Sequence, residues 1–431
     1  MQQLYHDSMA IVREFGKPDL FVTVTCNPVW PEIADELLPN QVPNDRPDLV
    51  ARVFKLKLNA ITEDLFKKGV LGKVIAHVHV IEFQKRGLPH AHILMILAPE
   101  DKPKTPEDFD RLVCAEIPDQ NDQPKLFETV SKCMVHGPCG DLDPDSPCMV
   151  DGKCSKRYHR DFVEVTSTNE HGYPLYRRRN NGRTIVKNNI SLDNRWIVPY
   201  NPYLCQKYNC HINVEICSSI RSVKYLYKYV YKGHDRVIIS IRDSKDSHDE
   251  ITNYLNARYV SASESCWRLF KFGLQQRSHT VMRLPVHMPD QQTVFFPEGE
   301  DLSSVLEKSS DTRLTRYFDI CANTPNLNLR YVDFPKEYVW KNGNWHPRKR
   351  GKDKVISRLY MCSPRDKERF YLRILLMQVY NATSYEDLRT VNGILYDTYE
   401  EAVRQLGLLD ENDEFDKCLK EAVTFQMPKQ L

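Results

Sequence analysis

Two histidines, His90 and His92, stand one residue apart in the apolar run GLPHAHILMIL at residues 87–97. Because side chains alternate between the faces of a β-strand, this spacing places both imidazoles on one face. The β-rich run VIAHVHVIEF at residues 74–83 precedes them, and the intervening KRGLP is typical of a hairpin loop. An antiparallel hairpin would bring Glu82 close to the pair. Two imidazoles and a carboxylate suit Mg²⁺ or Mn²⁺ acting as a Lewis acid on a phosphate.

Two alternatives to this metal site stay open. A one-residue change in loop register would turn Glu82 to the other face of its strand, and Gln84, in phase with Glu82, is the second candidate for the third ligand. His77 and His79 form another pair with the same spacing on the preceding strand. The pattern by itself therefore also fits two packed histidines.

A second chemical pattern is the tyrosine-rich run SSIRSVKYLYKYVYK at residues 218–232. On a helical wheel, Tyr225 and Tyr229 stand one turn apart on a side that also carries Arg221 and Lys232. A phenol is a weak nucleophile at neutral pH, and neighbouring cations favour the phenolate. The alternative is an amphipathic helix that binds nothing. Together, the histidine and tyrosine patterns predict an enzyme that cuts single-stranded DNA through a phosphotyrosine.

In their order along the chain, these motifs resemble the Rep/helicase-like domain of Helitron rolling-circle transposases, which are HUH single-strand endonucleases. The resemblance runs from about residue 3 to the end of the chain. It rests on FVTVTCNPVWPEI (21–33), VIEFQKRGLPHAHILMIL (80–97), VKYLYKYVYKGHD (223–235), RYVSASESCWRLF (258–270), PRKRGKDKVISRLYMCSP (347–364) and RILLMQVYNATSYEDLRTVNG (373–393).

The resemblance implies roles for the same residues. His90 and His92 would bind the divalent metal. Tyr225 or Tyr229 would attack a DNA phosphate, leaving a 5′-phosphotyrosine and a free 3′-hydroxyl, and the other tyrosine would serve the second strand transfer. Lys232 completes the family's two-tyrosine motif. The implied fold is α+β, with a central antiparallel sheet of the HUH/Rep nuclease type, flanking helices, a Cys-rich insertion and a mostly helical C-terminal region.

Partners and alternatives follow from the same resemblance. Family members continue into a superfamily 1 helicase, but no GxxxxGK[ST] phosphate loop occurs in this chain, so we expect a Rep-type segment without its helicase. The expected partner is single-stranded DNA at transposon ends, in the nucleus, with no membrane and no small-molecule substrate. Two other hypotheses are a catalytically inactive DNA-binding remnant and a zinc-dependent hydrolase, which would need a third imidazole ligand.

Cysteines gather in CMVHGPCGDLDPDSPCMVDGKCSKRYH at residues 133–159. Thirteen cysteines without a signal peptide or a long apolar stretch predict an intracellular reducing compartment rather than a disulfide scaffold. Clustered thiols among Gly, Pro and Asp favour a structural Zn²⁺ site, with free thiols as the alternative. The candidate ligands are Cys133, His136, Cys139, Cys148 and Cys154. A second group on the strand-like run 203–217 is better explained as buried apolar cysteines, although His211 could approach the metal site.

The chain has a formal net charge of only +2, so it carries no overall basic charge. Its charged residues are instead grouped in particular segments. Basic residues concentrate in 176–187 and 341–358, where interleaved aromatic residues would suit a single strand, whereas the segment after residue 409 is acidic. A solvated surface explains either basic run almost as well. The residues predicted to contact DNA are Arg221, Lys228, Arg348, Lys349 and Arg350.

We expect three regions along the chain. Residues 1–240 would form the nuclease domain, with a Cys-rich, zinc-binding insertion at 114–172. Residues 241–330 would form a helical and extended extension, and 331–431 a basic-to-acidic helical linker toward the helicase. The nuclease domain would contain a strand at 20–26 and a helix around 47–69.

Overall fold

The computed structural model describes residues 2–83, 87–169, 173–217, 260–292, 311–324 and 326–408. The chain forms two compact units, Met1–Ser278 and His279–Leu431. The boundary between the two units, after Ser278, lies within residues 241–330, which the sequence predicts to be a separate region. Gln84, the tyrosine-rich segment 218–232 and the acidic tail lie outside the described residues.

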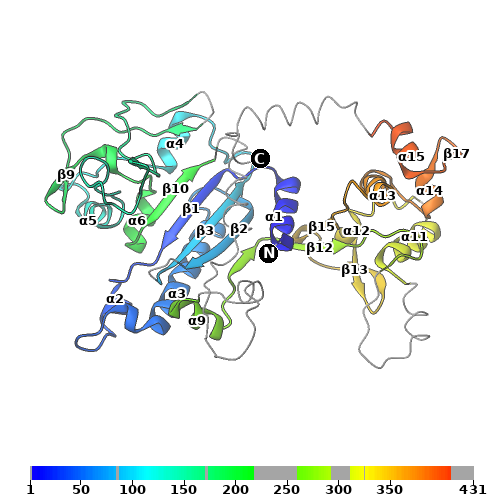
Figure 1. The fold of residues 1–431 in the computed structure, drawn as a ribbon, viewed down its shortest axis with the longest axis horizontal. Helices are drawn as coiled ribbons and strands as arrows, with labels where there is room; N and C mark the ends of the chain where they lie inside the picture. The colour runs from blue at the N-terminus through cyan, green and yellow to red at the C-terminus, as the bar shows by residue number, and fades with distance from the viewer. Residues whose placement is uncertain are drawn as a thin grey trace, which may run out of the picture. The chain divides into compact units, whose positions relative to one another are not determined.

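A five-stranded antiparallel sheet forms the centre of the first unit (Figure 1). Every neighbouring pair of strands is antiparallel, which confirms the expected central antiparallel sheet. In spatial order the strands are β10 (Ile212–Ile216), β1 (Leu20–Thr25), β3 (Pro89–Leu97), β2 (Val74–Phe83) and β11 (Gln275–Arg277).

The two faces of this sheet differ in chemistry. Alternate residues of β1, β3 and β10 are apolar and almost completely buried, and they form one core with the helices α3 (Pro47–Phe66) and α9 (Ala262–Leu269). Phe54 of α3 contacts Trp267 of α9, with ring centroids 6.1 Å apart. Because the side-chain period of a strand is two, burial of this apolar set fixes which residues point to the opposite face.

The N-terminal helix α1 (Gln2–Phe15) is tied to the edge strand β11. Nη1 of Arg277 donates to the buried carboxylate of Asp7 over 2.7 Å, and Nε2 of Gln275 donates to the Ser8 hydroxyl over 3.3 Å. A buried carboxylate needs such a charged partner, so this ion pair specifies where α1 packs.

A second hydrophobic cluster, built around Val130, Trp196 and Tyr200, lies beside β10, to which it is joined by a bridge between Tyr200 and Asn213 (Figure 1). It contains the Cys-rich segment.

The elements between β3 and β10 are α4 (Pro106–Leu112), α5 (Pro124–Cys133), β4 (Met149–Val150), β5 (Lys153–Cys154), β6 (Ser167–Thr168), β7 (Pro174–Leu175), β8 (Ile185–Lys187), β9 (Ile190–Leu192) and α6 (Pro202–Tyr208). The short helix α2 (Pro31–Ala34) follows β1.

The strand-like interpretation of residues 203–217 is wrong for its first half. Pro202 occupies the first turn of α6, and the Asn201 side chain accepts a hydrogen bond from Leu204 N over 3.1 Å, so a capped helix starts here. Only β10 is a strand. The prediction that Cys205, Cys210 and Cys217 are buried is confirmed.

The second unit has its own core, in which Tyr317, Tyr331 and Phe334 pack against one another. Its strands form the parallel pair β12 (Thr280–Leu284) and β15 (Val355–Leu359), and the hairpins β13 (Tyr338–Lys341) with β14 (Asn344–Pro347) and β16 (Thr390–Val391) with β17 (Ile394–Leu395). Its helices are α11 (Arg313–Asn323), α12 (Phe334–Glu337), α13 (Lys367–Gln378), α14 (Tyr385–Arg389) and α15 (Tyr399–Gln405). Within the described ranges, no helix has the length and apolar character needed to cross a membrane.

A buried carboxylate connects α3 to α6. Asp64 accepts hydrogen bonds from Lys207 Nζ at 2.5 Å, Lys68 Nζ at 2.8 Å and the Tyr208 hydroxyl at 2.7 Å. Burial by itself would raise the pKa of Asp64, but these three donors together hold that pKa below its usual value.

We expect Asp64→Asn to lower the free energy of unfolding at pH 7 by about 2 kcal/mol, because it weakens charged hydrogen bonds at a buried site. A carboxyl group with a depressed pKa stabilises the fold above its unfolded pKa of about 3.9, and this stabilisation is lost as pH falls further. The difference between variant and wild type in urea denaturation should therefore shrink below about pH 4. Glu63→Gln, one residue earlier and exposed, is the control. A difference that stays constant down to pH 2 would contradict the ionic role of Asp64.

Candidate active site

The β2–β3 hairpin brings the predicted metal ligands together. The strand register pairs Glu82 with His90, and His92 lies on the same face two residues further along β3. Nε2 of His92 is 3.1 Å from a carboxylate oxygen of Glu82. The register that would turn Glu82 away from the histidines is not the one adopted.

Two threonines of the neighbouring strand β1 orient the imidazoles. Thr25 pairs with His90 and Thr23 with His92 in the strand register. The Thr25 hydroxyl lies 2.9 Å from Nδ1 of His90, and the Thr23 hydroxyl lies 3.2 Å from Nδ1 of His92. Nδ1 of each ring contacts a threonine of β1. Nε2 is therefore the ring nitrogen that is left for another partner. This is the arrangement of metal-binding histidines, in which the second ring nitrogen is fixed by a neighbour.

Nε2 of His90 is buried and has no hydrogen-bond partner among the described residues. The pKa of His90 is lowered to about 3, mainly by burial and also by positive charge on His92 and His211, whereas Glu82 opposes the shift. The imidazole is therefore neutral, and its Nε2 atom carries a lone pair when Nδ1 donates its proton to the Thr25 hydroxyl. A buried polar atom without a partner is costly, and a cation is the kind of group that would satisfy this one.

The other histidine pair has a different environment. His77 and His79 are in register with Met95 and Ile93, so they lie on the apolar face of the sheet. His77 stacks on Phe66 of α3 with ring centroids 3.7 Å apart. The same sequence pattern thus gives histidines packed on the apolar face at β2 and histidines on the polar face at β3, where His92 contacts Glu82.

The Cys-rich segment brings four side chains together. The ligand atoms of His136, Cys139, Cys148 and Cys154 all lie within 4.8 Å of one another. Burial is the largest effect that lowers the pKa of His136, to about 4, so its imidazole is neutral. One imidazole and three thiols are a donor set used by structural zinc sites, and the arrangement is consistent with a metal such as Zn²⁺. Among the described residues, no other group of three or more such side chains is gathered as closely.

Cys133, the remaining predicted zinc ligand, is left out of this cluster. It is the last residue of α5, and its carbonyl oxygen lies 2.9 Å from Nδ1 of His211. The sequence could not choose between Cys133 and His136, because the turns that gather these ligands are short and irregular.

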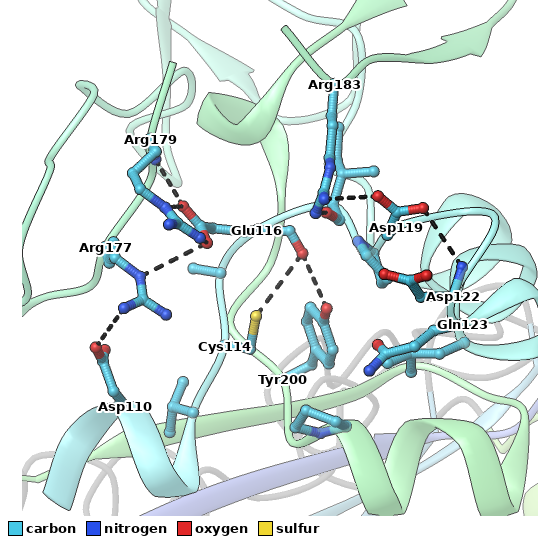
Figure 2. Close-up of a pocket in the computed structure, with 16 residues that line it drawn as sticks. Asp110, Cys114, Glu116, Asp119, Asp122, Gln123, Arg177, Arg179, Arg183 and Tyr200 are labelled. Atoms are coloured by element: carbon cyan, nitrogen blue, oxygen red, sulfur yellow. Dashed lines mark hydrogen bonds and ion pairs between the residues drawn. The ribbon is translucent and has the colours of Figure 1, made fainter. Parts of the chain in front are cut away.

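The basic run 176–187 is largely neutralised within the protein. Arg177, Arg179 and Arg183 line a cavity of about 410 Å³ opposite acidic residues of segment 110–122 (Figure 2). Arg179 binds both carboxylate oxygens of Glu116, at 2.9 Å and 2.6 Å. Arg183 pairs with Asp119 at 2.8 Å and Arg177 with Asp110 at 3.1 Å. Such partners compete with phosphate, so these arginines do not form an open phosphate-binding surface.

The other predicted DNA contacts have varied placements. Arg348 follows β14, and its Nε donates to the carbonyl of Pro335 over 3.0 Å. Lys349 and Arg350 are exposed and form no ion pair with the residues that the structure describes. The predicted catalytic and DNA-binding residues of the tyrosine-rich segment, Arg221, Tyr225, Lys228, Tyr229 and Lys232, lie outside the described residues.

The β1–β3 part of the sheet, with its histidine pair, can be compared with known protein families. Residues 1–95 match the family described as the Helitron helicase-like domain at N-terminus. The first 95 residues are therefore similar to the N-terminal region of Helitron-type proteins. This region includes Glu82, His90 and His92, and it ends before the Cys-rich and tyrosine-rich segments of the chain. A search of curated proteins finds no match. The Helitron match indicates a transposase-related role.

We expect His90 to remain neutral at pH 5, because its folded pKa is about 3 and the imidazole is buried. The unfolded chain takes up this proton below about pH 6.5, so His90 makes the fold less stable as pH falls below that value. Two-dimensional ¹⁵N NMR of the imidazoles, with His90→Gln used for assignment, would follow the proton. Titration of the assigned His90 signal near pH 6.5 would contradict the buried, neutral imidazole.

Proposed function

We propose that this protein is a metal-dependent single-stranded DNA endonuclease and strand transferase of a Helitron-type transposon. The observation that carries the proposal is the β2–β3 hairpin, where Glu82 and His92 approach one another and His90 presents a buried Nε2 without a partner. This hairpin lies inside the region that matches the Helitron domain. Single-stranded DNA at transposon ends is the proposed substrate, in the nucleus, and the HUH type is the proposed class of the fold.

The proposed reaction uses tyrosine as the nucleophile. The phenolic oxygen of Tyr225 or Tyr229 forms a bond to the phosphorus of the scissile phosphate, and the bond from phosphorus to the 3′-oxygen breaks. The phenolic proton passes to solvent, and the departing 3′-oxygen takes up a proton. The products are a 5′-phosphotyrosine and a free 3′-hydroxyl, and attack by a 3′-hydroxyl on the phosphotyrosine reverses the step.

The polar face of the sheet would bind the cation for this chemistry. His90, His92 and Glu82 would hold Mg²⁺ or Mn²⁺, which would polarise a phosphate oxygen when bound. Thr23 and Thr25 would keep the two imidazoles in a ligand-competent orientation. Lys232 would neutralise phosphate charge beside the tyrosines.

A covalent-adduct assay tests the mechanism. Incubation with labelled single-stranded oligonucleotides and Mn²⁺, followed by boiling in SDS, should give a labelled protein band. Tyr225→Phe combined with Tyr229→Phe should remove this band because no phenol remains to attack. His90→Ala should weaken adduct formation at least about tenfold, since a metal ligand is lost.

Tyr227→Phe is the matched control for the adduct assay, because the helical wheel places this tyrosine on the apolar side. Its adduct should equal that of the wild type. Undiminished cleavage in EDTA would remove the metal from the mechanism. DNA binding on a native gel without any adduct would favour the inactive DNA-binding remnant.

We also propose that His136, Cys139, Cys148 and Cys154 bind a structural Zn²⁺ ion. The support is the closeness of the four ligand atoms in a segment of short turns. A fully protein-ligated zinc would hold these turns together and would leave no coordination position for a substrate.

Metal analysis of the purified chain should find roughly one Zn²⁺ per protein. Cys154→Ser should lose it and should increase proteolysis between residues 133 and 159, because the ligands then no longer restrain the turns. Cys133→Ser is the control, since Cys133 lies outside the cluster. Equal zinc content in wild type and Cys154→Ser would show that the four residues are plain thiols and an imidazole.

A further inference from the structure

The cavity of Figure 2 carries opposite charges on walls that face one another. The run 177–183 contributes arginines, and segment 110–122 contributes carboxylates. Its volume of about 410 Å³ lies within the range of about 300–1,000 Å³ that is usual for small-molecule sites. A ligand of this cavity would therefore meet hydrogen-bond donors and acceptors together.

Asp119 organises one end of the cavity. Its carboxylate pairs with Arg183 at 2.8 Å and accepts a hydrogen bond from the N–H group of Asp122 at 3.4 Å. The Asp119 carbonyl accepts a further hydrogen bond from Gln123 N at 2.9 Å, at the start of α5. The guanidinium group, the Asp122 carboxylate and the Gln123 amide are thus held around one residue (Figure 2).

The three side chains around Asp119 have unused hydrogen-bonding capacity. Arg183 donates from Nη1 to the Ile117 carbonyl and from Nη2 to Asp119, but a guanidinium has five N–H groups. Among the described residues, the side chains of Asp122 and Gln123 form no hydrogen bond. A carboxylate can accept two hydrogen bonds side by side, and an amide can both donate and accept.

A neutral nucleobase fits this set of groups better than a phosphate does. A phosphate would have to displace carboxylates from the arginines, and the Asp122 carboxylate would repel it. Guanine carries no charge and offers O6 and N7 as acceptors, for which arginine is the commonest partner. Its N1–H and amino group lie side by side and can donate to the two oxygens of one carboxylate. No other DNA base combines these two patterns.

The cavity is in line with the histidine pair across the sheet. Cys114 forms a bridge with Tyr200, and Tyr200 forms one with Asn213 of β10. Asn213 pairs with Thr23, and Thr23 pairs with His92. Because directly opposed residues of antiparallel strands project to the same face, Cys114 and Tyr200, which line the cavity, project to the face that carries His92. Four steps of about 4.8 Å span roughly 19 Å, which is a few nucleotides along a strand.

We propose that the end of the cavity around Asp119 receives one unstacked guanine of the single-stranded DNA substrate. Arg183 donates its remaining N–H groups to O6 and N7, and the Asp122 carboxylate accepts from N1–H and the amino group. Asp119 holds both side chains in place. This inference rests on the proposed function and specifies a sequence preference of its substrate. A base of a single strand is unstacked at lower cost than a base of a duplex, so the site requires no strand opening.

Binding of labelled strands to the full chain tests this assignment without requiring cleavage. Fluorescence anisotropy without added Mn²⁺ would compare a homothymine strand with the same strand carrying one guanine. The wild type should bind the guanine strand at least about fivefold more tightly. Hypoxanthine, which lacks the amino group, and 7-deazaguanine, which lacks N7, should each lose most of this preference. Equal affinity for the guanine and homothymine strands would overturn the inference.

Asp122→Ala tests the carboxylate without disturbing the fold, because Asp122 is exposed. This variant should lose most of the preference for guanine, since the acceptor for N1–H is gone. Glu100→Ala removes an exposed carboxylate outside the cavity and is the matched control, which should keep the wild-type preference. A guanine preference that survives in Asp122→Ala would overturn the assignment.

Two further comparisons separate this site from the proposed chemistry and from a free nucleotide. Tighter binding of dGMP than of the guanine strand would identify a free nucleotide as the ligand and overturn the assignment to DNA. At limiting protein, a covalent adduct that forms equally on strands with and without guanine would overturn this inference and leave the proposed function standing. A guanine preference that depends on Asp122, with no adduct on any strand, would support the site and remove the nuclease.

Discussion

The structure depends on one constraint, which is the alternation of side chains along the β2–β3 hairpin. Ala91, Ile93 and Met95 must enter the core, so the residues between them must face the other way. The same register that buries the apolar set places His90 opposite Glu82. A shift by one residue would expose the core and bury the histidines in it, so the stability of the sheet and the geometry of the proposed metal site are specified together.

The hairpin alone does not make a ligand site, because an imidazole can rotate. Hydroxyl groups of Thr23 and Thr25 on β1 fix the two rings, and β1 itself is held between β3 and β10. The two proposed ligands are therefore supported by neighbouring side chains on a hydrogen-bonded sheet, which is what precise metal chemistry requires. The same requirement explains why His77 and His79 differ, since their strand face offers Phe66 rather than a hydroxyl or a carboxylate.

The parts that the sequence predicts well are local. Period-two alternation predicts the antiparallel β2–β3 hairpin, because the hairpin depends on residues close together in the chain, whereas the register that decides whether Glu82 faces the histidines stayed open. Contacts between segments that are far apart in the sequence were not predicted. Nothing in the run of arginines at 177–183 indicates that residues 110–119 neutralise it, and Asn201 with Pro202 starts a helix where alternation suggested a strand. The tyrosine-rich segment stays a prediction from its helical period and its resemblance.

The contact between the Cys-rich segment and the β10 edge of the sheet is also non-local. A Cys-rich segment far from the proposed chemistry in the sequence is packed against the β10 edge of the sheet. If its only role were to stabilise itself, its contact with the sheet could be made by any apolar residue. The contact instead includes a backbone carbonyl that fixes the tautomer of a histidine in line with His90. This contact connects the Cys-rich segment to the strand edge that lies in line with His90, so the packing of the segment and the packing of the sheet edge depend on one another.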